Sequence, residues 1–169
     1  AALVHQNFGA KRGRPFPDHH DRISETEVGF PGGISITVLS VYLHCGDGLS
    51  QRNRDILAAL VAAVLTLNTP WCIGGDFNME PSVLIASGFA EKVGGELVTA
   101  NGATCFQANT EFDFFVVSHA LAAYTKSVRI CEGAPCRPHA PVSLCLIGLR
   151  SQQVIWKQRL FNKPVLDAI

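Results

Sequence analysis

The sequence predicts an α/β sandwich, because strand-like and helix-like apolar segments alternate before several strands close the chain. Residues 34–43 first alternate apolar and polar side chains and then become apolar on both sides, as in a strand that enters a core. Residues 51–67 follow as an Ala/Leu/Val-rich segment of helical length, and residues 71–75 resemble a short buried strand. A strand, a helix, a strand and then further strands are typical of a layered α/β domain.

The remaining elements are expected from turn residues and caps. Residues 22–28 form a hairpin with residues 34–43 across the turn Phe30–Gly33. Ser50 is the expected N-cap of the helix, which must end before Pro70. We also expect a short helix at residues 82–89. Four further strands are expected at residues 96–99, 113–118, 127–131 and 142–149.

The Gly/Pro-rich segment 11–21 is expected to be a loop, and it contains the main basic cluster of the sequence. His19 and His20 stand there between two aspartates, which leaves a metal site as one interpretation. Adjacent side chains point in different directions and rarely share one ion, so a solvated loop is the favoured interpretation.

Composition fits one domain and limits the partners. The chain has 169 residues, of which 47% are apolar and 17% charged, so it is large enough to bury a sizeable core. Its 14 basic and 14 acidic residues balance, so no overall field attracts it to nucleic acid or to an anionic membrane, and any phosphate-binding site must be local. The most apolar stretch, residues 56–67, is shorter than the ~20 residues that span a bilayer, so we expect no membrane partner.

The two ends of the sequence and its cysteines suggest the cellular context. The start, AALVHQNFG, has no initiating Met and no signal-peptide features, so we expect a piece of a longer polypeptide with a further domain. Six cysteines without a C-x-x-C pair indicate a reducing compartment, in the cytoplasm or the nucleus. A Cys131–Cys136 bridge, or a zinc site of these two with His139, is an alternative that lacks further ligands.

Four polar residues stand at the ends of apolar strands. Asp76 and Asn78 follow residues 71–75, Asp113 begins the segment 113–118, and His139 precedes the last strand. A phosphodiesterase needs a carboxylate for a metal or a water, an amide for a phosphoryl oxygen, and an imidazole for developing charge. Taken singly, each residue also fits ordinary turn chemistry or a structural hydrogen bond.

The order of four motifs resembles the endonuclease/exonuclease/phosphatase (DNase I-like) superfamily, including apurinic-type and non-LTR retroelement endonuclease domains. The motifs are G-G-D-F-N-M-E-P, Y-L-H, E-F-D-F-F-V-V-S and P-H-A-P-V, at residues 74–81, 42–44, 111–118 and 138–142. The first is quite specific, and the others gain weight from their order. The resemblance covers residues 2–149, so we expect a family domain at 1–149 and a tail at 150–169.

The resemblance implies a two-sheet α/β sandwich and a hydrolase, usually magnesium-dependent, that attacks a phosphate ester of DNA, RNA or a phosphorylated small molecule. By position, Asp76 is similar to the residue that orients the water or the metal, and Asn78 and Tyr42 are similar to residues that contact the substrate phosphate. Asp113 and His139 match the family's aspartate–histidine pair. The implied catalytic set is therefore Asp76, Asn78, Asp113 and His139.

Two departures reduce the expected activity. The family takes a phosphate-contacting Asn and a metal-binding Glu from its first strands, and this chain has no counterpart of either, so we expect a partial fold without the first strands and helices. The family triplet S-D-H here is Arg137-Pro138-His139, which replaces a carboxylate by an apolar ring. Asp76 is then the only clear metal ligand, and we expect weak or absent Mg²⁺ binding.

Three functions remain open from the sequence. The first is a fragment of a nucleic-acid endonuclease-like hydrolase that is weakly active or inactive as this chain. The others are a non-catalytic remnant that acts as a binding or structural module, and a phosphatase of the same superfamily with a different substrate.

The tail contains Val154, Trp156 and Phe161 among basic residues, which favours an amphipathic helix that packs on the core or leads to a further domain rather than to a membrane.

Overall fold

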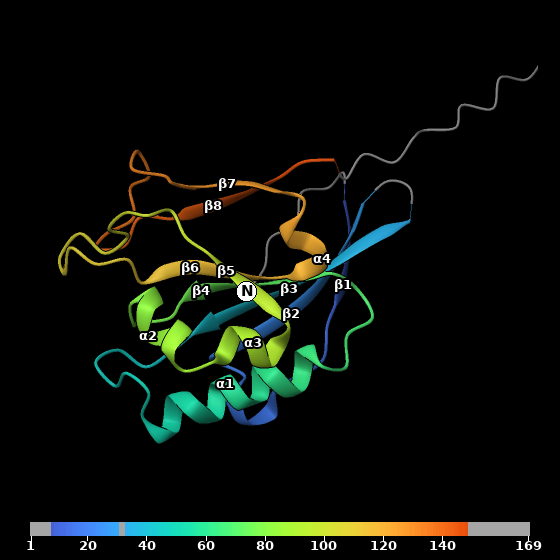
Figure 1. Ribbon diagram of the computed structural model, residues 1–169, viewed down its shortest axis with the longest axis horizontal. Coiled ribbons are helices and arrows are strands. Elements are labelled where there is room, and N and C mark those ends of the chain that lie inside the picture. Colours follow the sequence, from blue (N-terminus) through green and yellow to red (C-terminus); the bar gives the residue numbers. More distant parts are fainter. Residues whose placement is uncertain (1–7, 31–32, 149–169) are drawn as a thin grey trace, which may run out of the picture.

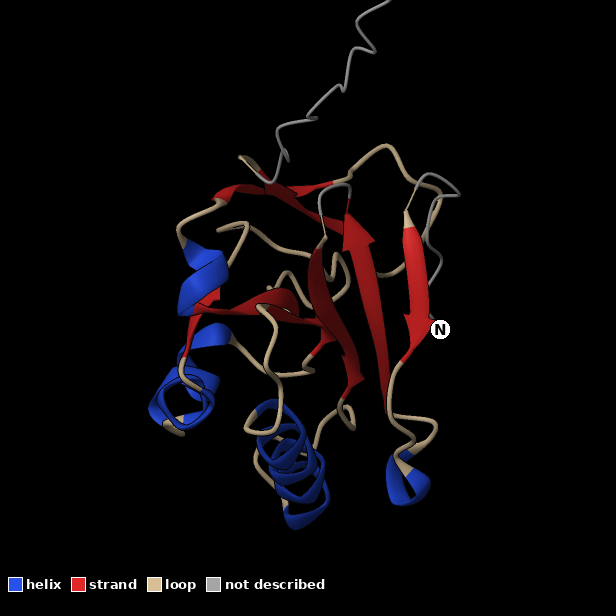
Figure 2. Cartoon of the chain, turned by 90° about the vertical axis from the view of Figure 1, so that its right-hand side faces the viewer, coloured by secondary structure: helices blue, strands red, loops and turns tan. Residues whose placement is uncertain are grey.

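The computed structural model describes residues 8–30 and 33–148, and these residues form a layered α/β fold. A six-stranded sheet lies in the middle, helices α1, α2 and α3 cover one face, and a two-stranded sheet lies over part of the other face (Figures 1 and 2). The α/β sandwich predicted from the sequence is confirmed. The residues of the tail lie outside the described part, so its helical prediction is untested.

The large sheet has the order β1-β2-β3-β4-β6-β5. Only β3 and β4 are parallel, with α1 as their connection, and the other neighbours are antiparallel. The strands are β1 (Gly9–Arg12), β2 (Ile23–Phe30), β3 (Ile34–Tyr42), β4 (Trp71–Asp76), β5 (Gly95–Val98), β6 (Asp113–Ser118), β7 (Thr125–Ile130) and β8 (Val142–Leu146). The helices are the 3-10 turn η1 (Pro17–His19), α1 (Gln51–Val64), α2 (Pro81–Ala86), α3 (Phe89–Val93) and α4 (His119–Ala122).

Alternation along the central strands gives the sheet two different faces. Leu39, Ile73 and Phe114 are fully buried in the larger core, together with side chains of α1 and α3. The Phe114 ring stacks on Phe77 with centroids 4.2 Å apart, and Phe77 directly follows β4. On the opposite face a smaller core contains Cys72, with Leu144 and Leu146 of β8 packed against it. Polar side chains occupy this face at the other end of the same strands.

Several boundaries differ from the sequence prediction. Part of the segment predicted as a loop is strand β1, because its backbone pairs antiparallel with the edge of β2 although all four of its residues are exposed. The helix predicted over 51–67 ends at Val64, and the strand predicted over 142–149 ends at Leu146. The helix predicted over 82–89 ends at Ala86, and a second helix begins at Phe89 after Gly88, which has a left-handed φ of 70°.

The six cysteines are free. Cys72 and Cys105 are buried, whereas the other four are exposed. Burial raises the pKa of the Cys72 thiol to about 12, so this side chain behaves as a small apolar group.

Within the described residues, no helix combines the length and apolarity needed to cross a membrane.

The loop between β3 and α1 is held by one buried amide. Ser50 caps α1 by accepting a hydrogen bond from the Asn53 backbone N–H, as its sequence position predicted. The Asn53 side chain is fully buried, accepts from the His44 N–H at 2.8 Å, and donates to the carbonyls of His44 and Gly48 at 3.1 and 2.8 Å. This amide fixes the backbone that directly follows Tyr42.

We expect Asn53→Ala to lower the free energy of unfolding by roughly 1–3 kcal/mol, because it removes the partners of backbone groups in a partly buried loop. Urea unfolding followed by circular dichroism measures the change. The control is Gln51→Ala at an exposed position of the same helical turn, for which the expected change is within about 0.5 kcal/mol. Equal effects of the two substitutions would show that the amide does not fix this loop.

Candidate active site

Three strands bring three of the predicted site residues into one row. Tyr42 of β3 is the register partner of Asp76 of β4, and Asp76 is in turn the partner of Asp113 of β6. Residues directly opposite each other on neighbouring strands point to the same face of a sheet. The three side chains therefore share the face opposite to the helices, at one end of the central strands.

His139 joins this row through backbone pairing with a distant loop. The Phe106 N–H donates to the Pro138 carbonyl at 3.0 Å, and the Ala140 N–H donates to the Thr104 carbonyl at 2.7 Å. Cys105 thereby lies opposite His139 in an antiparallel bridge. The pairing holds the histidine at the edge of the site, where its side chain is 30% exposed.

A hydrogen bond between His139 and Asp113 defines the centre of the site. His139 Nδ1 lies 2.7 Å from Asp113 Oδ2, and it lies 3.8 Å from Asp76 Oδ2. Because an ionised carboxylate only accepts, the short contact assigns the Nδ1 proton to His139 and leaves Nε2 available to a substrate. Two carboxylates and one accessible imidazole thus converge, although their residues are far apart in the sequence.

Asp76 has an altered acidity. Burial raises the pKa of its carboxyl, and the negative charge of Asp113 acts in the same direction. The Asn78 backbone N–H donates to Asp76 Oδ1 at 2.9 Å and opposes that rise. The net effect is a carboxyl that holds its proton more tightly than in water.

Asn78 has a more structural position than its predicted role suggested. It takes a left-handed φ of 49°, which Asn tolerates better than most residues, and it is buried. Its Nδ2 donates to the Leu43 carbonyl at 2.8 Å and ties the loop after β4 to the end of β3. One amide proton of Asn78 is therefore used inside the protein.

Tyr42 is exposed and lies beside a cation. Tyr42 is 47% exposed, and the Arg22 guanidinium carbon lies 4.9 Å from the centre of the Tyr42 ring. Such a stacked pair presents a positive charge and a phenol hydroxyl next to the row of carboxylates. Sequence reasoning had not included Arg22.

Thr104 is a buried residue that the sequence analysis missed. Its hydroxyl donates to Asp113 Oδ2 at 2.7 Å and accepts from the backbone N–H groups of Phe112 and Asp113 at 2.9 and 3.0 Å. Its backbone carbonyl receives the bond from Ala140, next to the histidine. Thr104 therefore positions both members of the His139–Asp113 pair.

The metal-ligating groups of the described residues gather at this same point. Carboxylate oxygens of Asp76 and Asp113 and a ring nitrogen of His139 all lie within 4.8 Å of one another. In the described part of the chain, neither Cys131 nor Cys136 joins His139 in such a group, and the His19–His20 pair forms none. The zinc and loop-metal alternatives from the sequence thus gain no support.

Comparisons with known proteins identify the fold. No family model matches the sequence, and no curated protein is significantly similar to it. Solved structures do match: the endonuclease domain of TRAS1, a telomere-specific non-LTR retrotransposon, superposes with a TM-score of 0.68 at 12% identity. The AP endonuclease LMAP of Leishmania major has a TM-score of 0.60 at 16% identity. An endonuclease/exonuclease/phosphatase family protein of Leptotrichia buccalis has a TM-score of 0.54 at 13% identity.

These structures share the DNase I-like fold, so the chain has the fold of the endonuclease/exonuclease/phosphatase superfamily that its motifs resemble. The matches cover 83%, 82% and 73% of this chain, respectively. The chain in turn spans 67%, 61% and 52% of the three solved chains. At identities this low, the structural superpositions demonstrate a common fold and nothing finer.

We expect Thr104→Val to disorder the His139–Asp113 pair, because the methyl group keeps the volume but removes the donor to Asp113 and the acceptor of two backbone N–H groups. The loss is expected to be about 1–3 kcal/mol in unfolding free energy. The matched variant is Thr104→Ser, which keeps the hydroxyl and is expected to retain most of the stability and the histidine's NMR chemical shifts. If Thr104→Val leaves both stability and these shifts unchanged, the hydroxyl does not position the pair.

We expect Asp76→Asn to stabilise the fold at pH 7. The raised pKa of Asp76 means that the folded chain binds its proton more tightly than the unfolded chain, so stability falls as pH rises through the folded-state pKa. The amide has no such charge and still offers an oxygen to the Asn78 N–H. Urea unfolding at several pH values should show the gain at pH 7 and its disappearance below about pH 4, where the carboxyl is protonated in both states. A gain that persists in acid would contradict this origin.

Proposed function

We propose that this chain is the aspartate–histidine part of a metal-dependent hydrolase that cleaves phosphodiester bonds of nucleic acid, and that it has low turnover by itself. The observation that carries the proposal is the 2.7 Å contact of His139 with Asp113 beside Asp76, at one end of a DNase I-like sheet. Neither this pair nor the shared fold alone points to this chemistry, since aspartate–histidine pairs and folds both serve many functions.

His139 is the proposed group that meets the charge of the phosphoryl centre. The bond from Nδ1 to Asp113 fixes the ring orientation, and a ring that carries protons on both nitrogens offers the Nε2 proton to negative charge that develops on the substrate. Nε2 is then free to donate to a phosphoryl oxygen or to the leaving oxygen. The partial exposure of the side chain is consistent with contact to a substrate.

Asp76 is the proposed acceptor for the proton of the attacking water. A carboxylate with a raised pKa is a stronger base than one in water, and it is therefore better suited to take up a proton. Asp76 is the register partner of Tyr42 and accepts from the Asn78 backbone N–H, so it adjoins the two residues proposed to contact the phosphate. Tyr42 and the free proton of the Asn78 amide are the proposed donors to the phosphate oxygens.

The donor set fits a magnesium ion mainly through Asp76. A hard cation of this type prefers about six oxygen ligands, and proteins commonly give it one or two carboxylates while water and substrate phosphate supply the rest. Asp113 Oδ2 already accepts from His139 and Thr104, and Pro138 offers no side-chain oxygen. When bound, the ion would withdraw charge from a phosphoryl oxygen as a Lewis acid. One carboxylate implies weak binding, which is the reason for the low turnover that we propose.

Nucleic acid is the proposed substrate class because two of the similar structures are, by their names, an endonuclease domain and an AP endonuclease. Both are less than 25% identical to this chain, so their activities remain properties of those proteins. The alternative is a non-catalytic module, and the small number of carboxylates favours it. The two functions differ in one measurable respect, which is dependence of cleavage on His139.

We expect the purified chain to nick supercoiled plasmid and DNA with an abasic site only slowly, at a rate close to background, in excess Mg²⁺. Any cleavage above background should fall to background in His139→Ala, since loss of one acid–base group typically costs 10²–10⁴-fold. His119→Ala, at an exposed histidine outside the site, is the control for contaminating nuclease and for handling.

Three outcomes decide between the functions. Slow cleavage that requires Mg²⁺ and His139 supports the proposed hydrolase. Fast cleavage would show that Asp76 and the remaining ligands suffice for the metal and that the proposed low turnover is wrong. Cleavage that is the same in His139→Ala and in His119→Ala, or that is not detectable at any metal concentration, would favour the non-catalytic module.

A further inference from the structure

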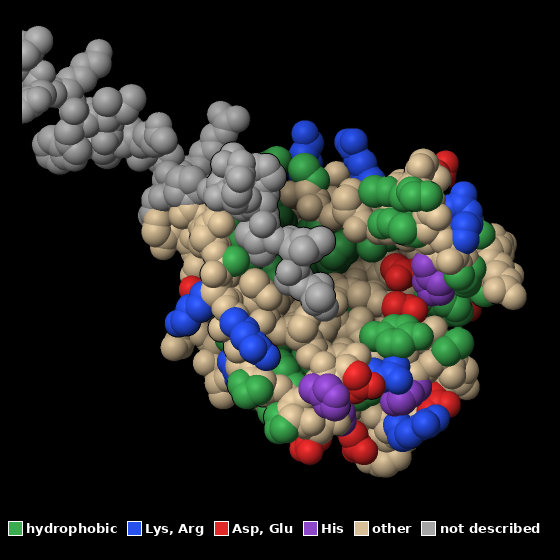
Figure 3. All heavy atoms as spheres, turned by 180° about the vertical axis from the view of Figure 1, so that it is seen from behind, with side chains coloured by type: hydrophobic (Ala, Val, Ile, Leu, Met, Phe, Trp, Pro, Cys, Tyr) green, Lys and Arg blue, Asp and Glu red, His purple; other side chains and the backbone are tan. Residues whose placement is uncertain are grey.

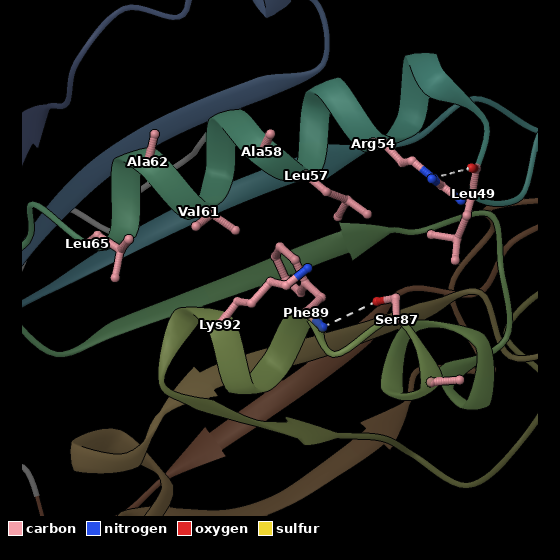
Figure 4. A pocket seen from close by; sticks show the side chains of 11 residues that line it. Leu49, Arg54, Leu57, Ala58, Val61, Ala62, Leu65, Ser87, Phe89 and Lys92 are labelled. Atoms are coloured by element: carbon pink, nitrogen blue, oxygen red, sulfur yellow. Dashed lines mark hydrogen bonds between the residues drawn. The ribbon is translucent and has the colours of Figure 1, made fainter.

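A recess among the described residues lies on the other side of the sheet from the candidate active site. It has a volume of about 790 Å³ and lies between α1 on one side and the end of α2 and α3 on the other. Figure 4 shows Leu57 and Val61 of α1 and Phe89 and Lys92 of α3 pointing into the space between the helices. Both helices pack on the sheet face that is opposite to Asp76 and His139.

Beyond its first turn, the outer surface of α1 is apolar, where a surface helix is usually polar. No charged residue occurs between Asp55 and Asp76, and α1 turns Ala58, Ala62 and the following Leu65 outward. Leu65 is 68% exposed. A helix that is apolar on its outer face as well as its inner face normally has a partner on both.

Two cations lie at this recess without carboxylate partners in the described part of the chain. Arg54 and Lys92 both line it, and neither forms an ion pair with a described residue. Arg54 donates only its Nε, to the Leu49 carbonyl at 2.8 Å, which leaves its terminal nitrogens free. None of the residues that line the recess is acidic.

We propose that this recess binds an acidic amphipathic helix of a partner protein. The helix would place apolar side chains at i, i+3, i+4 and i+7 between α1 and α3, and its carboxylates beside Arg54 and Lys92. The 14 residues of α1 match a partner helix of about four turns, since each residue rises by about 1.5 Å. Apolar burial supplies the affinity, and the two ion pairs select the charge and direction of the partner.

Shape and charge distinguish this partner from two others. A bilayer accepts protruding apolar side chains, whereas the apolar side chains here line a hollow that a ridge of side chains fits. A second copy would dock the same patch on itself in a two-fold dimer, since such interfaces are self-complementary. That arrangement would bring two copies of Arg54 and Lys92 together with no acidic lining residue to neutralise them.

The binding test uses the full chain and two labelled helical peptides in fluorescence anisotropy. The first probe has about 18 residues, Leu at the i, i+3, i+4 and i+7 positions, and Glu on the flanking positions, and the second has Lys in place of each Glu. We expect the acidic probe to bind at least about five times more tightly than the basic probe, because exposed ion pairs are each worth up to about 1 kcal/mol.

The variants locate the site. Ala62→Glu puts a charge at an exposed position on the wall of the recess, and it should abolish binding of the acidic probe while thermal unfolding stays unchanged. Lys92→Glu should weaken the acidic probe and strengthen the basic one. Gln51→Glu adds the same charge on the same helix outside the recess and should change the affinity less than about twofold.

Each other outcome overturns the proposal. Equal affinity for the two probes removes the charge selection, and binding that survives Ala62→Glu removes the recess as the site. A dimer in sedimentation velocity that Ala62→Glu dissociates would assign the recess to a second copy. Cosedimentation with vesicles of phosphatidylcholine and phosphatidylserine, lost in Ala62→Glu, would assign it to a membrane. None of these readouts depends on the chemistry proposed for His139.

Discussion

The central position of strand β4 is the constraint on which the candidate site depends. β4 pairs in parallel with β3 and antiparallel with β6, and only this double pairing aligns Tyr42, Asp76 and Asp113 in one row. Two glycines of β4, Gly74 and Gly75, lie close to atoms of the neighbouring strands. A Cβ at Gly75 would lie 1.9 Å from the Val41 carbonyl oxygen, and one at Gly74 would meet the ring of Phe115. Gly75, directly before Asp76, is therefore required by the close approach of the β3 backbone, whereas a side chain at Gly74 would have to displace the Phe115 ring.

The sequence predicted the parts of this molecule that depend on local periodicity. Alternating and continuous apolar runs predicted the hairpin, α1 and the central strands, because burial on one or two faces of a sheet leaves a regular pattern. The motif order also identified Asp76, Asp113 and His139 as residues that the structure brings together. The roles of these residues remain predictions, since geometry alone does not test them.

What the sequence could not show depends on contacts between distant segments. Thr104 is one threonine in an irregular loop, and only the pairing of its segment with residues 138–140 reveals its function as a support of Asp113. Strand β1 is exposed along its whole length, so no apolar pattern predicts it. The internal hydrogen bond of Asn78 to Leu43 likewise follows from how β3 and β4 end side by side.

The charge distribution limits how a nucleic acid can bind to this chain. One member of the basic cluster is paired in the fold: Arg14 forms an ion pair with Glu25 at 2.8 Å, and Lys11 is the register partner of Glu27 on the neighbouring strand. With no net charge, the chain gains little from long-range attraction to a polyanion.

Figure 3 shows acidic and basic side chains interspersed on the face of the molecule that it displays, with histidines among them. Affinity for a phosphodiester must therefore come from short-range contacts, and Arg22 is a cation beside Tyr42 although its Nε also pairs with Asp21 Oδ2 at 3.1 Å. A site built from so few charges requires the exact placement that β4, Thr104 and the His139–Asp113 bond provide, because contact geometry has to replace the attraction that the whole protein lacks.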